Sequence, residues 1–221
     1  MPLQQTYDSL YVHYGRQHWW PGETAFEVMV GSVLTQNTAW TNVEKAIANL
    51  KHADLMTAEK IVTTKHDKLA SLLRPSGYFN IKAKRLRNFC EWYVKHGGWV
   101  TLSRWPTTKL RAALLSVNGI GPETADDMVL YAFKRPVFVI DAYTRRLFAR
   151  LGLVSGEERY ETLRAVFEDG LKDLPANKRT QLFNEYHALI VRHAKDVCRK
   201  RPLCETCCLA LQCRYVSTQV G

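Results

Sequence analysis

The segment LRAALLSVNGIGPETADDMVLYAF, residues 110–133, decides what kind of fold this sequence can form. Apolar residues repeat at helical spacing on both sides of its centre, and Pro122, whose missing N–H costs nothing in a first turn, starts the second helix. Between the helices, Gly119 and Gly121 flank the single apolar residue Ile120. Two glycines permit a very tight connection, which leaves the N–H groups of the second helix open to a phosphate. The segment predicts a helical hairpin that holds a nucleic-acid backbone without reading its sequence. An ordinary glycine-containing helix connection is the alternative.

The other segments repeat the helical pattern. Apolar residues recur every three or four positions in residues 26–34, 42–50, 82–93 and 180–197. The run 136–140 is strand-like but too short to imply a sheet. We therefore expect an all-α fold.

Composition favours a polyanionic partner. The 221 residues include 31 Lys and Arg against 21 Asp and Glu, a formal net charge of +10. This excess suits nucleic acid or an acidic membrane surface, and a generally basic solvated surface is the alternative. Hydrophobic residues at 46% and charged residues at 24% exclude a disordered or collagen-like chain.

The sequence predicts neither a membrane span nor a secretion signal. Its longest uncharged stretch, residues 28–43, is broken by Gly31 and by the polar run 35–38. The N-terminal segment lacks the basic start and apolar run of a signal peptide, so we expect a cytoplasmic protein. In that compartment, five of six cysteines falling between Cys198 and Cys213 favour a metal site over disulfides.

Asp141 closes a short apolar run that ends with Val139 and Ile140. Burial would raise the pKa of this carboxyl unless hydrogen-bond donors hold it ionised. Taken alone, Asp141 predicts the N-cap of a helix over residues 142–150. Following a glycine hairpin, it fits a second pattern. The hairpin followed by Asp141 resembles the helix-hairpin-helix (HhH-GPD) DNA glycosylase superfamily, which includes endonuclease III and the adenine-mismatch glycosylases.

The resemblance covers nearly the whole chain and implies a two-domain architecture. Residues 25–124 would form a six-helix domain ending in the helix-hairpin-helix motif at about 110–133. Residues 1–24 and 125–221 would form a discontinuous helical domain that carries an iron–sulfur loop.

The resemblance also implies the chemistry. Asp141 takes the place of the catalytic aspartate, which stabilises the oxocarbenium-like sugar and orients or deprotonates water. Glu123 stands where bifunctional members carry a lysine, and a carboxylate cannot form a Schiff base, so the enzyme is expected to be monofunctional. Glu123 would instead line the pocket mouth, as a substrate contact or a second electrostatic group.

Further residues are implied as DNA contacts. Gln36, in the segment 34–38, and Tyr78, in the segment 77–83, would fill the space left by a flipped base. Contacts to the backbone are expected from Gly119, Ile120, Gly121, Thr124, Arg199, Lys200 and Arg201.

Four C-terminal cysteines are similar to the superfamily's iron–sulfur loop. Cys198, Cys204, Cys207 and Cys213 would hold a [4Fe-4S] cluster, although the first gap is one residue shorter than usual in the family. Cys208 is an alternative third ligand, and a structural zinc site is the alternative to the cluster.

The substrate expectation rests on aromatic residues. Trp19, Trp20, Pro21 and Trp40 lie in motifs that resemble the base pocket of bacterial 3-methyladenine glycosylases. Electron-rich rings attract the cationic charge of an alkylated purine, but these residues could equally belong to a hydrophobic core. We expect a base-excision-repair N-glycosylase, monomeric, that removes an alkylated purine such as 3-methyladenine from duplex DNA. The alternatives are an endonuclease III-like glycosylase and AP lyase acting on oxidised pyrimidines, and a non-catalytic DNA-structure-binding protein.

Overall fold

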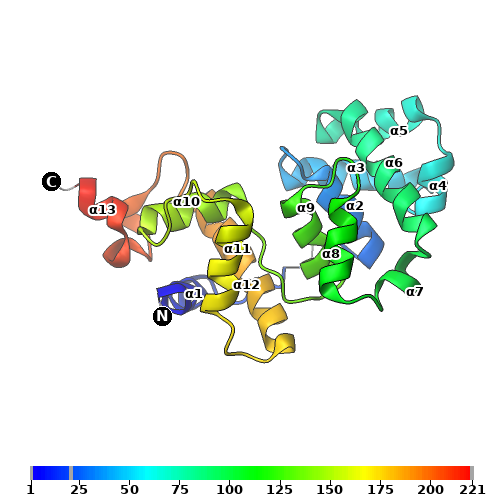
Figure 1. The fold of residues 1–221 in the computed structure, drawn as a ribbon. Helices are drawn as coiled ribbons and strands as arrows, with labels where there is room; N and C mark the ends of the chain where they lie inside the picture. Colours follow the sequence, from blue (N-terminus) through cyan, green and yellow to red (C-terminus); the bar gives the residue numbers. More distant parts are fainter. Residues whose placement is uncertain (1, 20–21, 220–221) are drawn as a thin grey trace. The chain divides into compact units, whose positions relative to one another are not determined.

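The computed structural model describes residues 2–19 and 22–219, and the regular secondary structure of these residues is helical throughout (Figure 1). This confirms the expected all-α fold. The strand-like run 136–140 forms no strand, and its residues from Val137 to Ile140 are buried. No helix in the described part of the chain is long and apolar enough to cross a membrane.

The chain divides into two compact units, residues 20–134 and residues 1–19 with 135–221, here called the central and the terminal unit. The central unit contains the helices α2 (Ala25–Leu34), α3 (Trp40–His52), α4 (Ala58–Thr63), α5 (His66–Leu73), η1 (Arg74–Ser76), α6 (Phe79–Lys95), α7 (Gly98–Leu102), α8 (Thr107–Leu115), α9 (Pro122–Asp127) and the π-helical η2 (Met128–Ala132). The terminal unit contains α1 (Pro2–Tyr14), α10 (Ala142–Leu151), α11 (Tyr160–Gly170), α12 (Ala176–Asp196), η3 (Cys204–Thr206), η4 (Ala210–Gln212) and α13 (Arg214–Gln219).

The central unit spans residues 20–134, whereas the sequence predicted a domain from residue 25 to residue 124. Helix α9 runs on into η2, and both pack against α2, so the second helix of the hairpin stays with the first in one unit. Within the described residues of this unit the helical segments also outnumber the expected six, because short helices such as α4 and α7 separate the longer ones.

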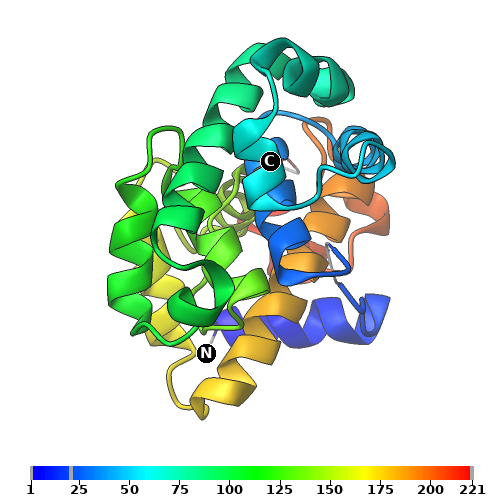
Figure 2. The ribbon, with the colours of Figure 1, turned by 90° about the vertical axis from the view of Figure 1, so that its right-hand side faces the viewer.

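Helix α2 forms the core of the central unit. Thr24 caps its N-terminus by accepting a hydrogen bond from the Glu27 amide at 3.1 Å. Its apolar residues from Val28 to Leu34 are buried, and α3, α6, α9 and η2 pack against it. Helices α4 and α5 both pack against α6 (Figures 1 and 2). The loop after α2 and the turn before α6 therefore start from well-anchored helices.

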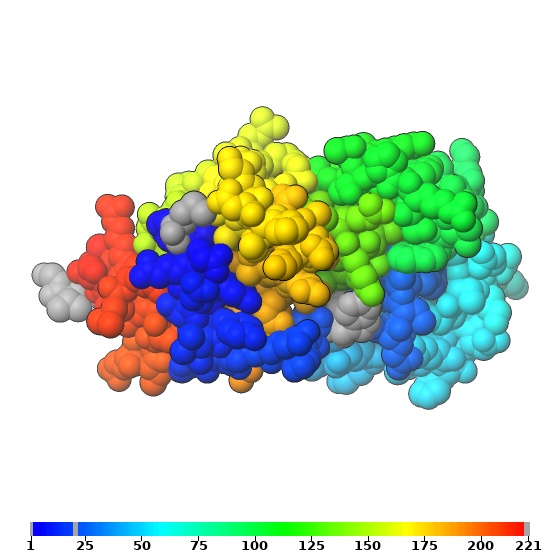
Figure 3. Space-filling model, turned by 90° about the horizontal axis from the view of Figure 1, so that it is seen from below, coloured from blue at the N-terminus to red at the C-terminus, as the bar shows by residue number. Residues whose placement is uncertain are grey.

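Aromatic rings form the core of the terminal unit. Phe138 stacks on Phe167 with 4.4 Å between ring centroids, and Tyr186 of α12 meets both rings edge-on. The Tyr186 hydroxyl donates to the Leu3 carbonyl at 2.7 Å, which fastens α1 to α12. Figure 3 shows the blue atoms of the N-terminal segment against the yellow and orange atoms of α11 and α12.

Candidate active site, hairpin and cysteine loop

The hairpin between α8 and α9 uses its two glycines differently. Gly119 has φ +97°, a left-handed conformation, and a Cβ there would collide with the Arg85 side chain. Gly121 has an ordinary extended backbone, and a Cβ there would meet nothing within 4 Å. Gly119 is thus required by the fold, whereas Gly121 leaves open space in front of the first turn of α9.

Ile120 and Thr124, both expected to contact DNA phosphates, are buried and hydrogen-bonded within the protein. The Ile120 side chain is buried and its N–H donates to Val117 O at 3.0 Å, so this amide is not presented outward. Thr124 is also buried, and its hydroxyl accepts a hydrogen bond from Gln36 Nε2 at 3.0 Å. Of the expected hairpin contacts, Gly121 is the exposed one.

Gln36 connects the loop after α2 to the hairpin. Its Nε2 donates to Gly119 O at 3.0 Å, and its Oε1 accepts from Arg85 Nη1 at 2.5 Å. Arg85 was not among the residues expected at the site. Tyr78, by contrast, projects from the turn before α6, with φ +45° and 69% of its surface exposed.

Asp141 is largely buried, with 13% of its side chain exposed, and its neighbours favour the ionised form. It is the N-cap of α10, since its Oδ1 accepts from the Thr144 amide at 2.7 Å. Its Oδ2 lies 3.4 Å from His187 Nε2 of α12. Burial raises the pKa of Asp141, but the contacts with His187 and Thr144 outweigh burial and hold the pKa below its usual value. The site is therefore a carboxylate that accepts from the Thr144 amide and lies beside His187, a neighbour that sequence reasoning missed.

Glu123 lies exposed in the first turn of α9, in the central unit. Its neighbour Asp126 is fully buried and pairs with Arg111, whose Nε donates at 2.6 Å. The two carboxylates thus have separate surroundings, and only Glu123 is open to solvent.

The four expected pocket residues are not all described. Trp20 and Pro21 lie outside the described residues. Trp19 is half-buried at the end of the first segment of the terminal unit. Trp40, at the start of α3, packs so closely on Gly31 that a Cβ there would lie 3.0 Å from the indole. Trp40 also lines an open hollow on the central unit. The other lining residues are Gly22, Glu23, Glu27, Glu44, Ile47, Ala48 and Lys51.

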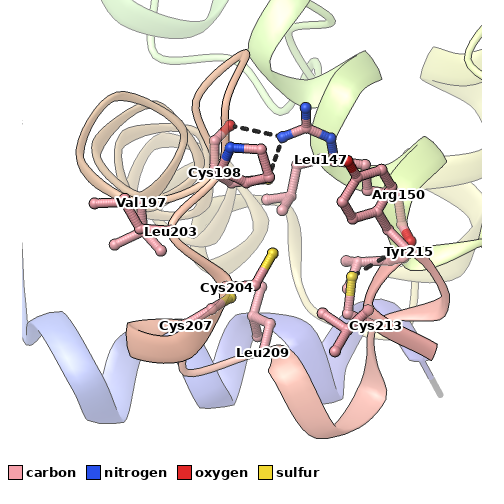
Figure 4. A pocket seen from close by; sticks show the side chains of 13 residues that line it. Leu147, Arg150, Val197, Cys198, Leu203, Cys204, Cys207, Leu209, Cys213 and Tyr215 are labelled. Atoms are coloured by element: carbon pink, nitrogen blue, oxygen red, sulfur yellow. Dashed lines mark hydrogen bonds between the residues drawn. The ribbon is translucent and has the colours of Figure 1, made fainter. Parts of the chain in front are cut away.

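The cysteine loop encloses one apolar pocket in the terminal unit. Cys198, Cys204, Cys207 and Cys213 all line it, together with residues such as Leu147, Leu209 and Tyr215 (Figure 4). Cys208 is not part of the lining. All six cysteines are free thiols. Among the described residues, no three His, Cys, Asp or Glu side chains are grouped closely enough to hold one metal ion.

Arg150 of α10 holds the start of this loop. Its Nη1 donates to Cys198 Sγ at 3.2 Å (Figure 4). The same Nη1 donates to Arg199 O at 2.6 Å, and Nη2 donates to Lys200 O at 3.1 Å. The side chains of Arg199, Lys200 and Arg201 remain exposed. The loop therefore exposes three positively charged side chains, while Arg150, which was not among the expected site residues, binds the loop backbone.

The chain matches known DNA repair proteins over most of its length. Residues 30–173 match the model of the HhH-GPD superfamily of base excision DNA repair proteins. A candidate DNA repair glycosylase of Methanocaldococcus jannaschii is 48% identical over 93% of this chain and 92% of its own length. Endonuclease III of Thermotoga maritima is 30% identical over 86% of this chain and 83% of its own.

Solved structures show the same fold. The 3-methyladenine DNA glycosylase of H. pylori, in a crystal structure with 1,N6-ethenoadenine, superposes with a TM-score of 0.76 at 31% identity, over 88% of this chain and 96% of its own. An endonuclease III–DNA complex superposes with a TM-score of 0.82 at 19% identity, over 99% of this chain and 97% of its own.

Proposed function

Because the chain belongs to the HhH-GPD superfamily of base excision DNA repair proteins, we propose that it is a monofunctional DNA N-glycosylase that releases an alkylated purine such as 3-methyladenine from duplex DNA. Family membership makes it a base excision repair DNA glycosylase. The observation that carries the proposed mechanism is the largely buried Asp141, whose neighbours favour the ionised form.

Asp141 would act mainly through its charge. Breaking the N-glycosidic bond leaves positive charge on the sugar, and a carboxylate already oriented by its surroundings stabilises that charge without reorganising. A carboxylate with a lowered pKa is a weak base, so its second task is to orient the attacking water more than to deprotonate it. The Thr144 amide donates to one oxygen and His187 lies beside the other, and both contacts favour the ionised form.

The absence of a lyase lysine at position 123 supports hydrolysis without strand cleavage. Glu123 offers no amine for a Schiff base. The pKa of Lys82 is lowered to about 8, mainly by burial, as in many nucleophilic lysines. The residue, however, is 1% exposed, and its ammonium donates to two backbone carbonyls, which leaves no path to a sugar. The proposal therefore assigns no Schiff-base step.

Two observations support a cationic purine as substrate. The hollow beside Trp40 combines this aromatic residue with Glu44, while Lys51 in the same lining pairs with Glu23 at 2.9 Å and Glu27 at 2.8 Å and offsets their charge. The indole and Glu44 are therefore the groups that favour a positively charged base. The H. pylori relative at 31% identity is a 3-methyladenine DNA glycosylase. A second candidate, removal of oxidised pyrimidines with strand cleavage, is favoured by the 30% identity to endonuclease III of T. maritima.

The cysteine pocket fits a [4Fe-4S] cluster held by Cys198, Cys204, Cys207 and Cys213. Thiols are the donors such clusters use, and four of them line a single apolar pocket. Four thiolates also suit a structural zinc ion, and metal analysis of the purified protein distinguishes the two. Cys208, outside the lining, is not included. When bound, the cluster would stabilise the loop that exposes Arg199, Lys200 and Arg201.

Duplex DNA would be held by the open surface at Gly121 and by the three basic residues of the cysteine loop, while Gln36 and Tyr78 would enter the duplex. These contacts are independent of sequence, as a repair enzyme that scans DNA requires.

The test is a base-release assay on duplexes that carry 3-methyladenine, thymine glycol or uracil, with borohydride added in parallel. We expect release of the methylated purine, an intact abasic strand and no trapped adduct. If borohydride efficiently traps the enzyme on thymine-glycol DNA and no methylated purine is released, this proposal is wrong. The second candidate, removal of oxidised pyrimidines with strand cleavage, would then take its place.

A further inference from the structure

Lys82 of α6 is a fully buried lysine whose hydrogen-bond partners are neutral. Its exposed fraction is 1%, and its Nζ donates to Leu34 O at 2.8 Å and to Ser76 O at 2.6 Å. Burying an ammonium without a carboxylate is costly. A buried lysine is therefore expected to make hydrogen bonds that an apolar side chain of the same size could not make.

Both acceptors are helix ends. Leu34 is the last residue of α2, and Ser76 is the last residue of η1, which follows α5 directly. The final carbonyls of a helix have no partner within the helix and carry the negative end of its dipole. One cation therefore caps two helix ends, at positions 42 residues apart in the sequence.

Each capped end leads straight into a segment that the proposed function places in DNA. Gln36 follows Leu34 by two residues, and Tyr78 follows Ser76 by two residues. The Lys82 amide also donates to Tyr78 O at 3.0 Å, and Arg85, one turn further along α6, donates to Gln36 Oε1. Helix α6 thus holds both segments through Lys82 and Arg85.

We propose that Lys82 is a positioning residue that fixes the loop 34–38 and the turn 76–78 relative to each other, so that Gln36 and Tyr78 enter the duplex at one lesion. This inference rests on the proposed function. A methionine of similar length would fill the same space but leave two helix-end carbonyls without a donor, and the two segments would then move independently.

Lys82→Met is compared with Lys84→Met, which removes the same charge from an exposed position on the same helix. Fluorescence anisotropy measures affinity for an intact duplex and for one with a stable abasic-site analogue. We expect Lys82→Met to lose at least tenfold of the preference for the abasic site, with intact-duplex affinity within twofold of wild type. Lys84→Met should weaken binding to both duplexes equally. Lys82→Arg, which keeps charge and donors, should recover most of the preference.

Hydrogen–deuterium exchange of the free proteins supplies a readout that needs no DNA. We expect Lys82→Met to exchange faster in both the 34–38 and the 76–81 segments, and Lys84→Met in neither. If Lys82→Met does not fold, Lys82→Gln, which keeps a short neutral donor, takes its place in both experiments. A folded variant with unchanged exchange in either segment, or with an unchanged abasic-site preference, would overturn the inference. If wild type itself shows no such preference, the proposed function fails, and exchange alone decides whether Lys82 couples the segments.

Discussion

Replacing Asp141 with asparagine separates its two roles, because asparagine is as good an N-cap as aspartate. The amide oxygen can still accept the Thr144 N–H, so α10 keeps its cap. What disappears is the negative charge near His187 and the substrate. Two unit charges about 4 Å apart attract by about 4 kcal/mol at an effective dielectric constant of about 20, which bounds the rate loss at roughly 10³-fold. Single preorganised groups commonly contribute about 10²–10³-fold, so we expect a loss in this range.

Single-turnover release of 3-methyladenine measures the rate, and chemical denaturation measures the free energy of unfolding. We expect Asp141→Asn to unfold within about 1 kcal/mol of wild type and to bind abasic-site DNA normally, whereas Asp141→Ala should also lose about 1 kcal/mol of capping energy. Asp173→Asn, an exposed substitution in the same unit, is the control and should leave both quantities unchanged. A rate for Asp141→Asn within threefold of wild type would refute the reasoning and leave Asp141 as a cap alone.

Other predictions concern the hairpin, the cysteine pocket and the buried lysine. Gly119→Ala should cost about 1–3 kcal/mol of stability, because φ +97° and the neighbouring Arg85 exclude a side chain. Gly121→Ala should keep the stability and weaken binding to all duplexes alike. Equal destabilisation by the two changes would contradict this interpretation of the hairpin. Anaerobically purified protein should be yellow-brown with about four irons per chain, and Cys204→Ser should lose them while Cys208→Ser keeps them; stoichiometric zinc in place of iron would exclude the cluster. The pKa of Lys82 is lowered to about 8, below an unfolded value of about 10.4, so the unfolded state binds the extra proton between these pH values. The free energy of unfolding of wild type relative to Lys82→Met should therefore rise with pH from about 8 to 10, and a flat difference in urea titrations would show that the lysine is not desolvated.

Features that depend on neighbouring residues could be predicted from the sequence. The all-α fold follows from apolar spacing along each helix, and the hairpin from two glycines around one apolar residue, since both patterns act over a single turn. The N-cap at Asp141 is local for the same reason, and the structure confirms it. The clustering of five cysteines between 198 and 213 is also visible in the sequence, whereas only the structure shows that Cys208 lies outside the pocket that the other four line.

Features that depend on distant partners were decided by tertiary packing. The sequence shows Lys82 as one lysine in a basic stretch, and only the convergence of two helix ends on α6 turns it into a buried double cap. Gln36 was expected at the DNA, and only packing shows that its amide is held by Arg85 and the hairpin. His187 reaches Asp141 only because α12 folds back onto α10. In each case a long polar side chain must find a donor or acceptor once water is excluded, and its partner lies far away in the sequence, where no local periodicity can indicate it.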